Sequence, residues 1–255
     1  LREAMLDMSM SRVVIRVVER HAISIVCDDV IEDSEKAVLR EKRQQQWEKL
    51  QAMGLQLDGQ SDEHTDVTPG VIALENLTII QSAAGTEFDS NALHIVSSGF
   101  NTIEISHCDF SSHCGTAVVV EGGDNIRFTS NRIHSSENNG VFVRSGDICT
   151  MVENDVIGNR GHGIEVADGG NPNMMRNFIA YNGHCGALVW RGGMGKWIAN
   201  HFFGNDTGGV SVSREGKPVM LENHIENNGA RGLVVHDNGQ GEYRLNIVSR
   251  HTEFE

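Results

Sequence analysis

Asparagine, glycine and apolar residues recur in the second half of the chain with a fixed period of 23 residues. A column of small residues runs from Ala117 through Gly140 to Gly232, and each member opens a short apolar stretch such as Val-Phe-Val or Leu-Val-Val. In a second column every member is asparagine, and an apolar residue follows each one two positions later: Asn131, Asn154, Asn177, Asn200, Asn223 and Asn246. Repetition of several columns in step is the signature of a solenoid, in which each repeat packs only on its neighbours.

Strand alternation assigns the residues of each repeat to two faces. The first and third residues after each small residue are mostly aliphatic, as at Val141 and Val143, and are predicted to point into the coil. Parallel strands of successive coils, ~4.8 Å apart, would stack residues one period apart. The period and the right-handed preference of parallel crossovers predict an all-β solenoid, a right-handed single-stranded parallel β-helix. The asparagines are expected to bridge coils through their amides and to take the left-handed bend of a turn.

The repeat divides the chain into four parts. Residues 73–250 are predicted to form the β-helix, residues 59–72 a solvated linker and residues 251–255 a tail too short to cover the last coil, where we expect a partner or further chain. Residues 1–58 lie outside the repeat, and their pattern predicts an α-helical segment from about Asp33 to Gly54, whereas residues 10–27 fit either a helix or a strand. This part is expected to cap the first coil or to bind a partner.

Composition narrows the classes of partner. The chain carries 21 basic and 35 acidic residues, a formal net charge of -14, which disfavours nucleic acid and anionic membranes. The sequence has no apolar run long enough for membrane insertion. Its 5 cysteines include no CxxC motif, so we expect buried thiols in a reducing, intracellular compartment.

Several phrases of the repeat resemble a known family. They are Asn-Gly-Val-Phe-Val (139–143), Glu-Asn-Asp-Val-Ile (153–157), His-Gly-Ile-Glu-Val (162–166) and Glu-Asn-His-Ile-Glu-Asn-Asn-Gly (222–229). They are similar to the pectate-lyase-like β-helix repeat, and more narrowly to the superfamily of carbohydrate-binding and sugar-hydrolase β-helices that includes those of F-box and SHC-binding proteins. The resemblance covers about residues 74–248 and implies the fold. Its members range from polysaccharide lyases and epimerases to protein-binding modules, so it implies no single function.

Three charged residues on the predicted outer face are candidates for carbohydrate chemistry. Glu121, Arg144 and Glu165 stand in neighbouring coils, where carboxylates beside a basic group would suit a lyase, epimerase or hydrolase. The alternative is a cross-strand ion pair of small energetic value. We expect no catalytic role for them.

Two further groups have metal-ligand chemistry. Asp124 and Asp147 stack in one turn and could hold Ca²⁺, although Asp is also common in turns for backbone reasons. His201 and His224 stack and could bind zinc or copper, but no third ligand falls in their column. His162 stacks over Cys185 in the same way. We therefore predict no metal or cofactor.

The outer face also carries apolar residues. Phe142, Leu188, Trp190 and Val234 would share this face and form a protein interface, unless the N-terminal segment covers them. The sequence thus predicts a non-catalytic scaffold subunit that docks other proteins in a larger assembly. The alternative is a carbohydrate-active enzyme or a polysaccharide-binding module.

Overall fold

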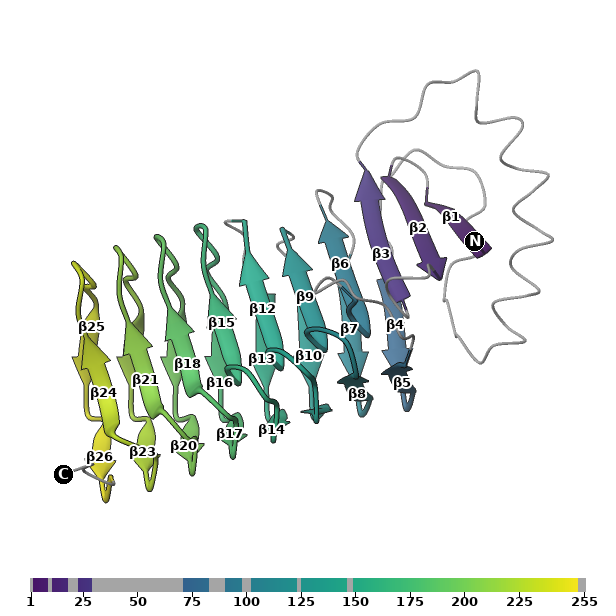
Figure 1. Ribbon diagram of the computed structural model, residues 1–255. Coiled ribbons are helices and arrows are strands. Elements are labelled where there is room, and N and C mark those ends of the chain that lie inside the picture. The colour runs from purple at the N-terminus through teal and green to yellow at the C-terminus, as the bar shows by residue number, and fades with distance from the viewer. Residues whose placement is uncertain are drawn as a thin grey trace.

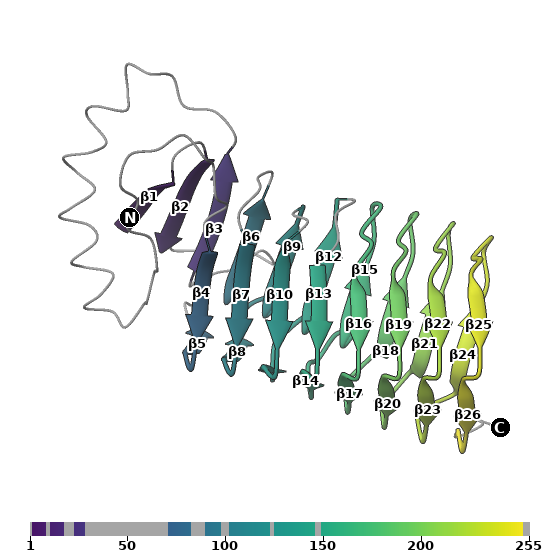
Figure 2. The ribbon, with the colours of Figure 1, turned by 180° about the vertical axis from the view of Figure 1, so that it is seen from behind.

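The computed structural model describes residues 2–8, 11–17, 23–28, 71–82, 90–97, 102–122, 125–145 and 149–251. Every element in these residues is a β-strand, and the strands form three sheets that run along a stack of coils (Figure 1). The view from behind shows the same parallel stacking on the opposite side (Figure 2). The predicted all-β parallel solenoid is therefore confirmed, while the predicted N-terminal helix lies outside the described residues.

Each coil contributes one strand to each sheet. Sheet A has ten strands: β1 (Arg2–Met8), β2 (Ser11–Val17), β3 (Ile23–Asp28), β6 (Leu93–Ser97), β9 (Val118–Glu121), β12 (Val141–Arg144), β15 (Ile164–Val166), β18 (Cys185–Val189), β21 (Gly208–Val212) and β24 (Arg231–Val235). Sheet B has eight: β4 (Val71–Glu75), β7 (Thr102–Ser106), β10 (Ile126–Thr129), β13 (Cys149–Val152), β16 (Asn173–Met175), β19 (Lys196–Ile198), β22 (Val219–Leu221) and β25 (Glu242–Arg244). Sheet C also has eight: β5 (Thr78–Gln81), β8 (Asp109–Ser112), β11 (Arg132–His134), β14 (Asp155–Ile157), β17 (Phe178–Ala180), β20 (His201–Phe203), β23 (His224–Glu226) and β26 (Ile247–Ser249).

The register between coils follows the sequence period. In sheet A, Phe142 pairs with Val119 of the preceding coil and with Glu165 of the next. At the N-terminal end, β3 joins β6 in parallel, and β1 and β2 continue the sheet in antiparallel fashion. Of residues 10–27, which fit either structure by pattern, the described part is strand.

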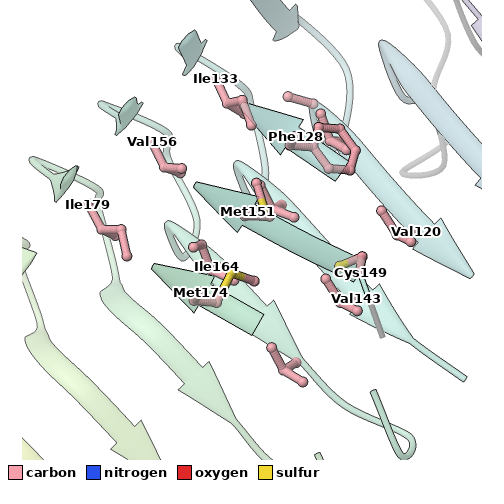
Figure 3. Close-up of a cluster of buried hydrophobic side chains, with 14 of the residues drawn as sticks. Val120, Phe128, Ile133, Val143, Cys149, Met151, Val156, Ile164, Met174 and Ile179 are labelled. Atoms are coloured by element: carbon pink, nitrogen blue, oxygen red, sulfur yellow. The ribbon is translucent and has the colours of Figure 1, made fainter. Parts of the chain in front are cut away.

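The core is the interior of the coils, where one column from each sheet converges. Figure 3 shows these side chains pointing inward, with Phe128, Met151 and Met174 stacked along sheet B. The inward columns are buried: Val120, Val143, Val166, Val189 and Val212 in sheet A; Phe128, Met151, Met174, Trp197 and Met220 in sheet B; and Ile133, Val156, Ile179, Phe202 and Ile225 in sheet C. Stacking like on like lets each side chain pack against its counterpart in the next coil, which is what the alternation predicted.

Two asparagine ladders close the turns on either side of sheet C. In the first, which lies between sheets B and C, the Nδ2 of Asn154 donates to the Oδ1 of Asn177 at 3.0 Å and to the main-chain oxygen of Phe128 at 3.1 Å. The second ladder follows sheet C and has the same geometry: Asn159, Asn182, Asn205 and Asn228. These side chains are buried, so each amide replaces the water that the turn backbone would otherwise need.

The left-handed bend was assigned to the wrong residue. A positive φ occurs not at the ladder asparagine but at the residue before it, as at Glu153 (56°), Arg176 (53°) and Ala199 (54°). The asparagine is occupied in bridging coils through its side chain and its own N–H, so its neighbour takes the bend that turns the chain from sheet B to sheet C.

At the C-terminal end, inward columns meet solvent. Val235 is 43% exposed and Val248 is 46% exposed, whereas their counterparts one coil earlier, Val212 and Ile225, are fully buried. A partner or further chain on this coil stays a prediction. Within the described residues, no helix is long and apolar enough to cross a membrane.

Candidate functional site on the outer face of sheet A

The outer face of sheet A collects most of the predicted site residues. Along one row, strand pairing places Phe142 beside Glu165, and Glu165 beside Leu188. The row continues through Ser211 to Val234. Each of these side chains points outward because its neighbours in the strand occupy the inward columns.

The charged trio is split by the structure. Arg144 donates a hydrogen bond to Glu121 and forms an ion pair with it, and His94 Nε2 lies 3.0 Å from Glu121 Oε1. Burial alone would raise the pKa of Glu121, but the hydrogen bonds and positive charges of Arg144 and His94 outweigh it, and the pKa is lowered. The Glu121 carboxylate is therefore held in an ion pair, as the ion-pair alternative anticipated. Its lowered pKa makes it a poor general acid.

Glu165, the third member, belongs to a different group. Its Oε1 accepts a hydrogen bond from the indole Nε1 of Trp190 at 2.8 Å, and its Oε2 accepts one from the Nδ2 of Asn139. Asn139 also receives the main-chain N–H of His162 on its Oδ1 at 2.8 Å. The role of Asn139 was missed because it stands one coil and three positions away from Glu165.

Guanidinium groups cover part of the Trp190 ring. The Cζ atoms of Arg191 and Arg214 lie 5.0 Å and 5.3 Å from the ring centroid, within the range of a cation–π contact. Arg191 also pairs with Asp168 at 2.7 Å. Trp190 is thus held by a carboxylate and by two cations.

The predicted apolar interface is a broken strip. Phe142, Leu188 and Val234 are all partly exposed in one row, but Glu165 and Ser211 separate them. Arg144 lies over the Phe142 ring at 5.6 Å. The four residues of the interface prediction share the face, as expected, but they do not form a continuous apolar patch.

A partly buried histidine lies just before strand β15 of sheet A. The Nδ1 of His162 accepts the main-chain N–H of Cys185 at 3.2 Å, and the His184 ring packs edge-on at 5.0 Å. Burial, reinforced by the proximity of His184, lowers the pKa of His162 to about 4, so it is neutral near pH 7. Burial also raises the pKa of the Cys185 thiol to about 11, which makes it a weak nucleophile.

The two metal predictions have different outcomes. Asp124 and Asp147, the calcium alternative, lie outside the described residues. His201 and His224 do stack on sheet C, with ring centroids 5.0 Å apart. No third ligand falls in their own column, as expected, but Glu226, two positions further along strand β23, reaches both rings from its own column.

Comparison with known proteins identifies the fold family. The family profile described as "Right handed beta helix region" matches residues 116–253, which is more than half of the chain. The chain belongs to this right-handed β-helix family. The predicted right-handed parallel β-helix is thereby confirmed. Among curated proteins no significant match was found.

One solved structure similar to this β-helix is the A-module of mannuronan C-5 epimerase AlgE4 from Azotobacter vinelandii. The similarity covers 73% of this chain and 91% of that one, with 12% sequence identity and a TM-score of 0.37.

What this β-helix presents on sheet A is a rigid, mixed face. Successive strands alternate apolar side chains with polar groups that are already bonded to one another, including both Glu121 and Glu165. Groups held in this way are pre-organised for binding, because little side-chain freedom remains to be lost.

Proposed function

We propose that this right-handed β-helix is a non-catalytic binding subunit that docks another protein on the outer face of sheet A. The observation that carries the proposal is the row of Phe142, Leu188 and Val234, partly exposed and spaced two coils apart, with Trp190 beside it. Partly exposed aromatic and aliphatic residues separated by polar ones on a single face match the mixed composition of protein interfaces, where Trp is enriched.

The polar residues of the face also suit a protein partner. Arg144, Arg191 and Arg214 flank the aromatic rings of Phe142 and Trp190. Arginine, tryptophan and phenylalanine are the residue types enriched at interfaces, because their large planar groups bury much area at a modest entropic cost.

The state of the acidic groups supports binding rather than catalysis. General acid–base work on a sugar needs one carboxyl group whose pKa is raised. The pKa of Glu121 is lowered instead, and Arg144 and His94 occupy the carboxylate. Glu165 accepts hydrogen bonds on both of its oxygens.

Polysaccharide binding is the second candidate, favoured by the group of Asn139, Glu165 and Trp190. A carboxylate, an amide and an indole bonded together on an exposed strand row resemble the planar polar surfaces that hydroxyl groups recognise. Against it, Arg191 and Arg214 lie over the Trp190 ring and reduce its use as a stacking platform.

Affinity purification of the full chain from its native cells, followed by mass spectrometry, tests the docking proposal. The variant Leu188→Asp places a charge in the middle of the strip, and the matched control Val219→Asp places one on sheet B, where the side chain is 38% exposed. Proteins that copurify with the wild type and the control, but not with Leu188→Asp, would support docking on sheet A. Retention of every partner by Leu188→Asp would overturn it.

A panel of neutral and uronate polysaccharides tests the second candidate with the same proteins and with Glu165→Gln. Retention on one polymer that is lost in Glu165→Gln and kept in Val219→Asp would favour the saccharide. The two candidates are thus separated by ligand and by the variant that abolishes binding.

A further inference from the structure

Three potential metal ligands meet on the outer face of sheet C. Strands β20 and β23 lie side by side near the C-terminal end of the stack (Figure 2), and their register pairs His201 directly with His224. Glu226 stands two positions after His224 in the same strand, so alternation points both side chains to the same face. The repeat itself therefore brings these three residues together.

The distances suit one ion. His201 Nε2 lies 3.3 Å from Glu226 Oε1, and His224 Nε2 lies 3.6 Å from Glu226 Oε2. A tetrahedral zinc ion with bonds of ~2.0–2.1 Å separates its ligand atoms by about 3.3–3.4 Å. The candidate ligand atoms all lie within 4.8 Å of one another, so an ion would require only small side-chain rotations.

The side chains have the freedom for that adjustment. The two rings are nearly parallel, at 11°, so one must turn for both Nε2 atoms to face a single ion. The side chains of His201 and His224 are 37% and 42% exposed, whereas the Glu226 side chain is only 19% exposed. The carboxylate is therefore the fixed point, and the rings can move around it.

The surroundings strengthen the attraction for a cation. Phe178 and Phe203 pack edge-on against His201, with ring centroids 5.4 Å and 5.8 Å away, and shield one side of the group from water. Reduced solvent screening increases the interaction of a divalent ion with the carboxylate. The formal net charge of -14 adds a long-range attraction of the same sign.

We propose that His201, His224 and Glu226 form a binding site for a divalent transition-metal ion of the zinc class. Two imidazole nitrogens select such an ion over Ca²⁺ and Mg²⁺, which prefer oxygen ligands. Three protein ligands leave a fourth position open to water or to a group from a bound partner. The site lies on a different sheet from the docking face, so it does not depend on the proposed function.

A comparable pair on the same sheet provides a matched control. His134 Nε2 lies 2.6 Å from Asp109 Oδ1, so here too a histidine is hydrogen-bonded to a carboxylate. There, however, Arg132 approaches the second carboxylate oxygen at 3.7 Å and supplies a competing positive charge. This pair should not bind the ion.

Titration of the full chain with ZnCl₂ at pH 7.5, followed by calorimetry, tests the site. We expect one ion per chain, with affinity weakened by at least about tenfold in Glu226→Gln and in His224→Asn, because each loses one of three ligands. His134→Asn should bind as the wild type does. Melting of the zinc-free variants, followed by circular dichroism, shows that each is folded before it is titrated.

Replacement of zinc by Co²⁺ reads the ligand geometry directly. Intense visible absorption in the wild type, lost in Glu226→Gln and kept in His134→Asn, would support a site of low coordination number formed by these residues. The proposal is overturned if the wild type binds no zinc, if several ions bind with no response to the variants, or if His134→Asn weakens binding as much as Glu226→Gln.

Discussion

The asparagine ladder between sheets B and C should stabilise the buried coils more than the last one. The loss of stability on replacing Asn177, in the middle of the ladder, measures its contribution there. Its Nδ2 donates to the main-chain oxygen of Met151 at 3.0 Å and to Asn200 Oδ1 at 2.9 Å. Its Oδ1 accepts both the main-chain N–H and the side-chain amide of Asn154, each at 3.0 Å. Replacement by alanine removes all four hydrogen bonds at a site that is 1% exposed.

The magnitude follows from which groups lose their partner. The main-chain N–H of Asn154 is left unsatisfied in a buried turn, which costs about 1–3 kcal/mol, and the other lost bonds add about 0.5–1.5 kcal/mol each. Partial relaxation of the surrounding turn offsets some of this loss, so Asn177→Ala should lower the free energy of unfolding by about 3–5 kcal/mol.

Asn246, the last ladder member, makes three of these four hydrogen bonds, in a setting that water can reach. Its Nδ2 donates to the main-chain oxygen of Met220, and its Oδ1 accepts the N–H of Asn223, but the side chain is only partly buried. Water can replace the lost amide there, so Asn246→Ala should cost only about 1 kcal/mol. The two variants remove identical atoms, but they differ in burial and by one hydrogen bond to the next coil.

Urea unfolding followed by circular dichroism measures the difference. With a denaturant dependence of about 2 kcal/mol per molar, Asn177→Ala should lower the midpoint by about 2 M and Asn246→Ala by about 0.5 M. Because repeat proteins can unfold in parts, hydrogen exchange at the amide of Asn154 supplies a local reading. Equal midpoint shifts in the two variants, or unchanged protection of Asn154 in Asn177→Ala, would refute the reasoning.

Three further predictions concern backbone space, pH and an unpaired donor. A Cβ at Gly163 would lie 2.7 Å from a main-chain oxygen of the next coil, so Gly163→Ala should lower the free energy of unfolding by about 3 kcal/mol. At Gly158 there is open space and only the positive φ of +63° is unfavourable, so Gly158→Ala should lower it by about 1 kcal/mol. Similar urea midpoints for the two variants would contradict this. The pKa of His162 is about 4, below its ordinary 6.5, so the unfolded chain takes up the proton first as pH falls. Stability should therefore decrease from about pH 6.5 to pH 4 by up to ~3 kcal/mol, and His162→Gln should lose that part of the pH dependence of the urea midpoint; an identical dependence would contradict it. Trp197 is fully buried, and its Nε1 has no hydrogen-bond partner in the described part of the chain. Trp197→Met extends the methionine column of Met174 and removes the unpaired donor, so it should lower the free energy of unfolding by less than about 2 kcal/mol in the same assay. A loss of stability typical of a large cavity would show the reasoning wrong.

Sequence periodicity predicted the β-helix fold well because the stacking of its coils is itself periodic. Residues 23 apart pair directly, as Val143 does with Val120 and with Val166. The register, the inward columns and both asparagine ladders follow from that one number. The turn conformation did not follow, since the left-handed residues Glu153, Arg176 and Ala199 share no chemical type that would mark them.

The candidate sites were predicted less completely because their contacts run diagonally. Trp190 reaches Glu165 across 25 positions, and Asn139 reaches the same carboxylate across 26. Long side chains lean along the strand and contact the diagonal neighbour in the next coil. Comparison within single columns finds His201 above His224 but misses Glu226, which stands two columns away.

This geometry suggests where function resides in a β-helix of this kind. A column in which every coil carries the same residue type, such as the ladder of Asn177, serves packing and turn closure, so its chemistry is uniform along the stack. Binding groups arise where an outward column departs from its type in adjacent coils, because two different side chains then meet one strand spacing apart. The column of Phe178, His201, His224 and Ile247 changes in this way, and so does the row that holds Glu165. Local departures from the repeat, and not the repeat itself, therefore mark both the proposed docking face and the proposed metal site.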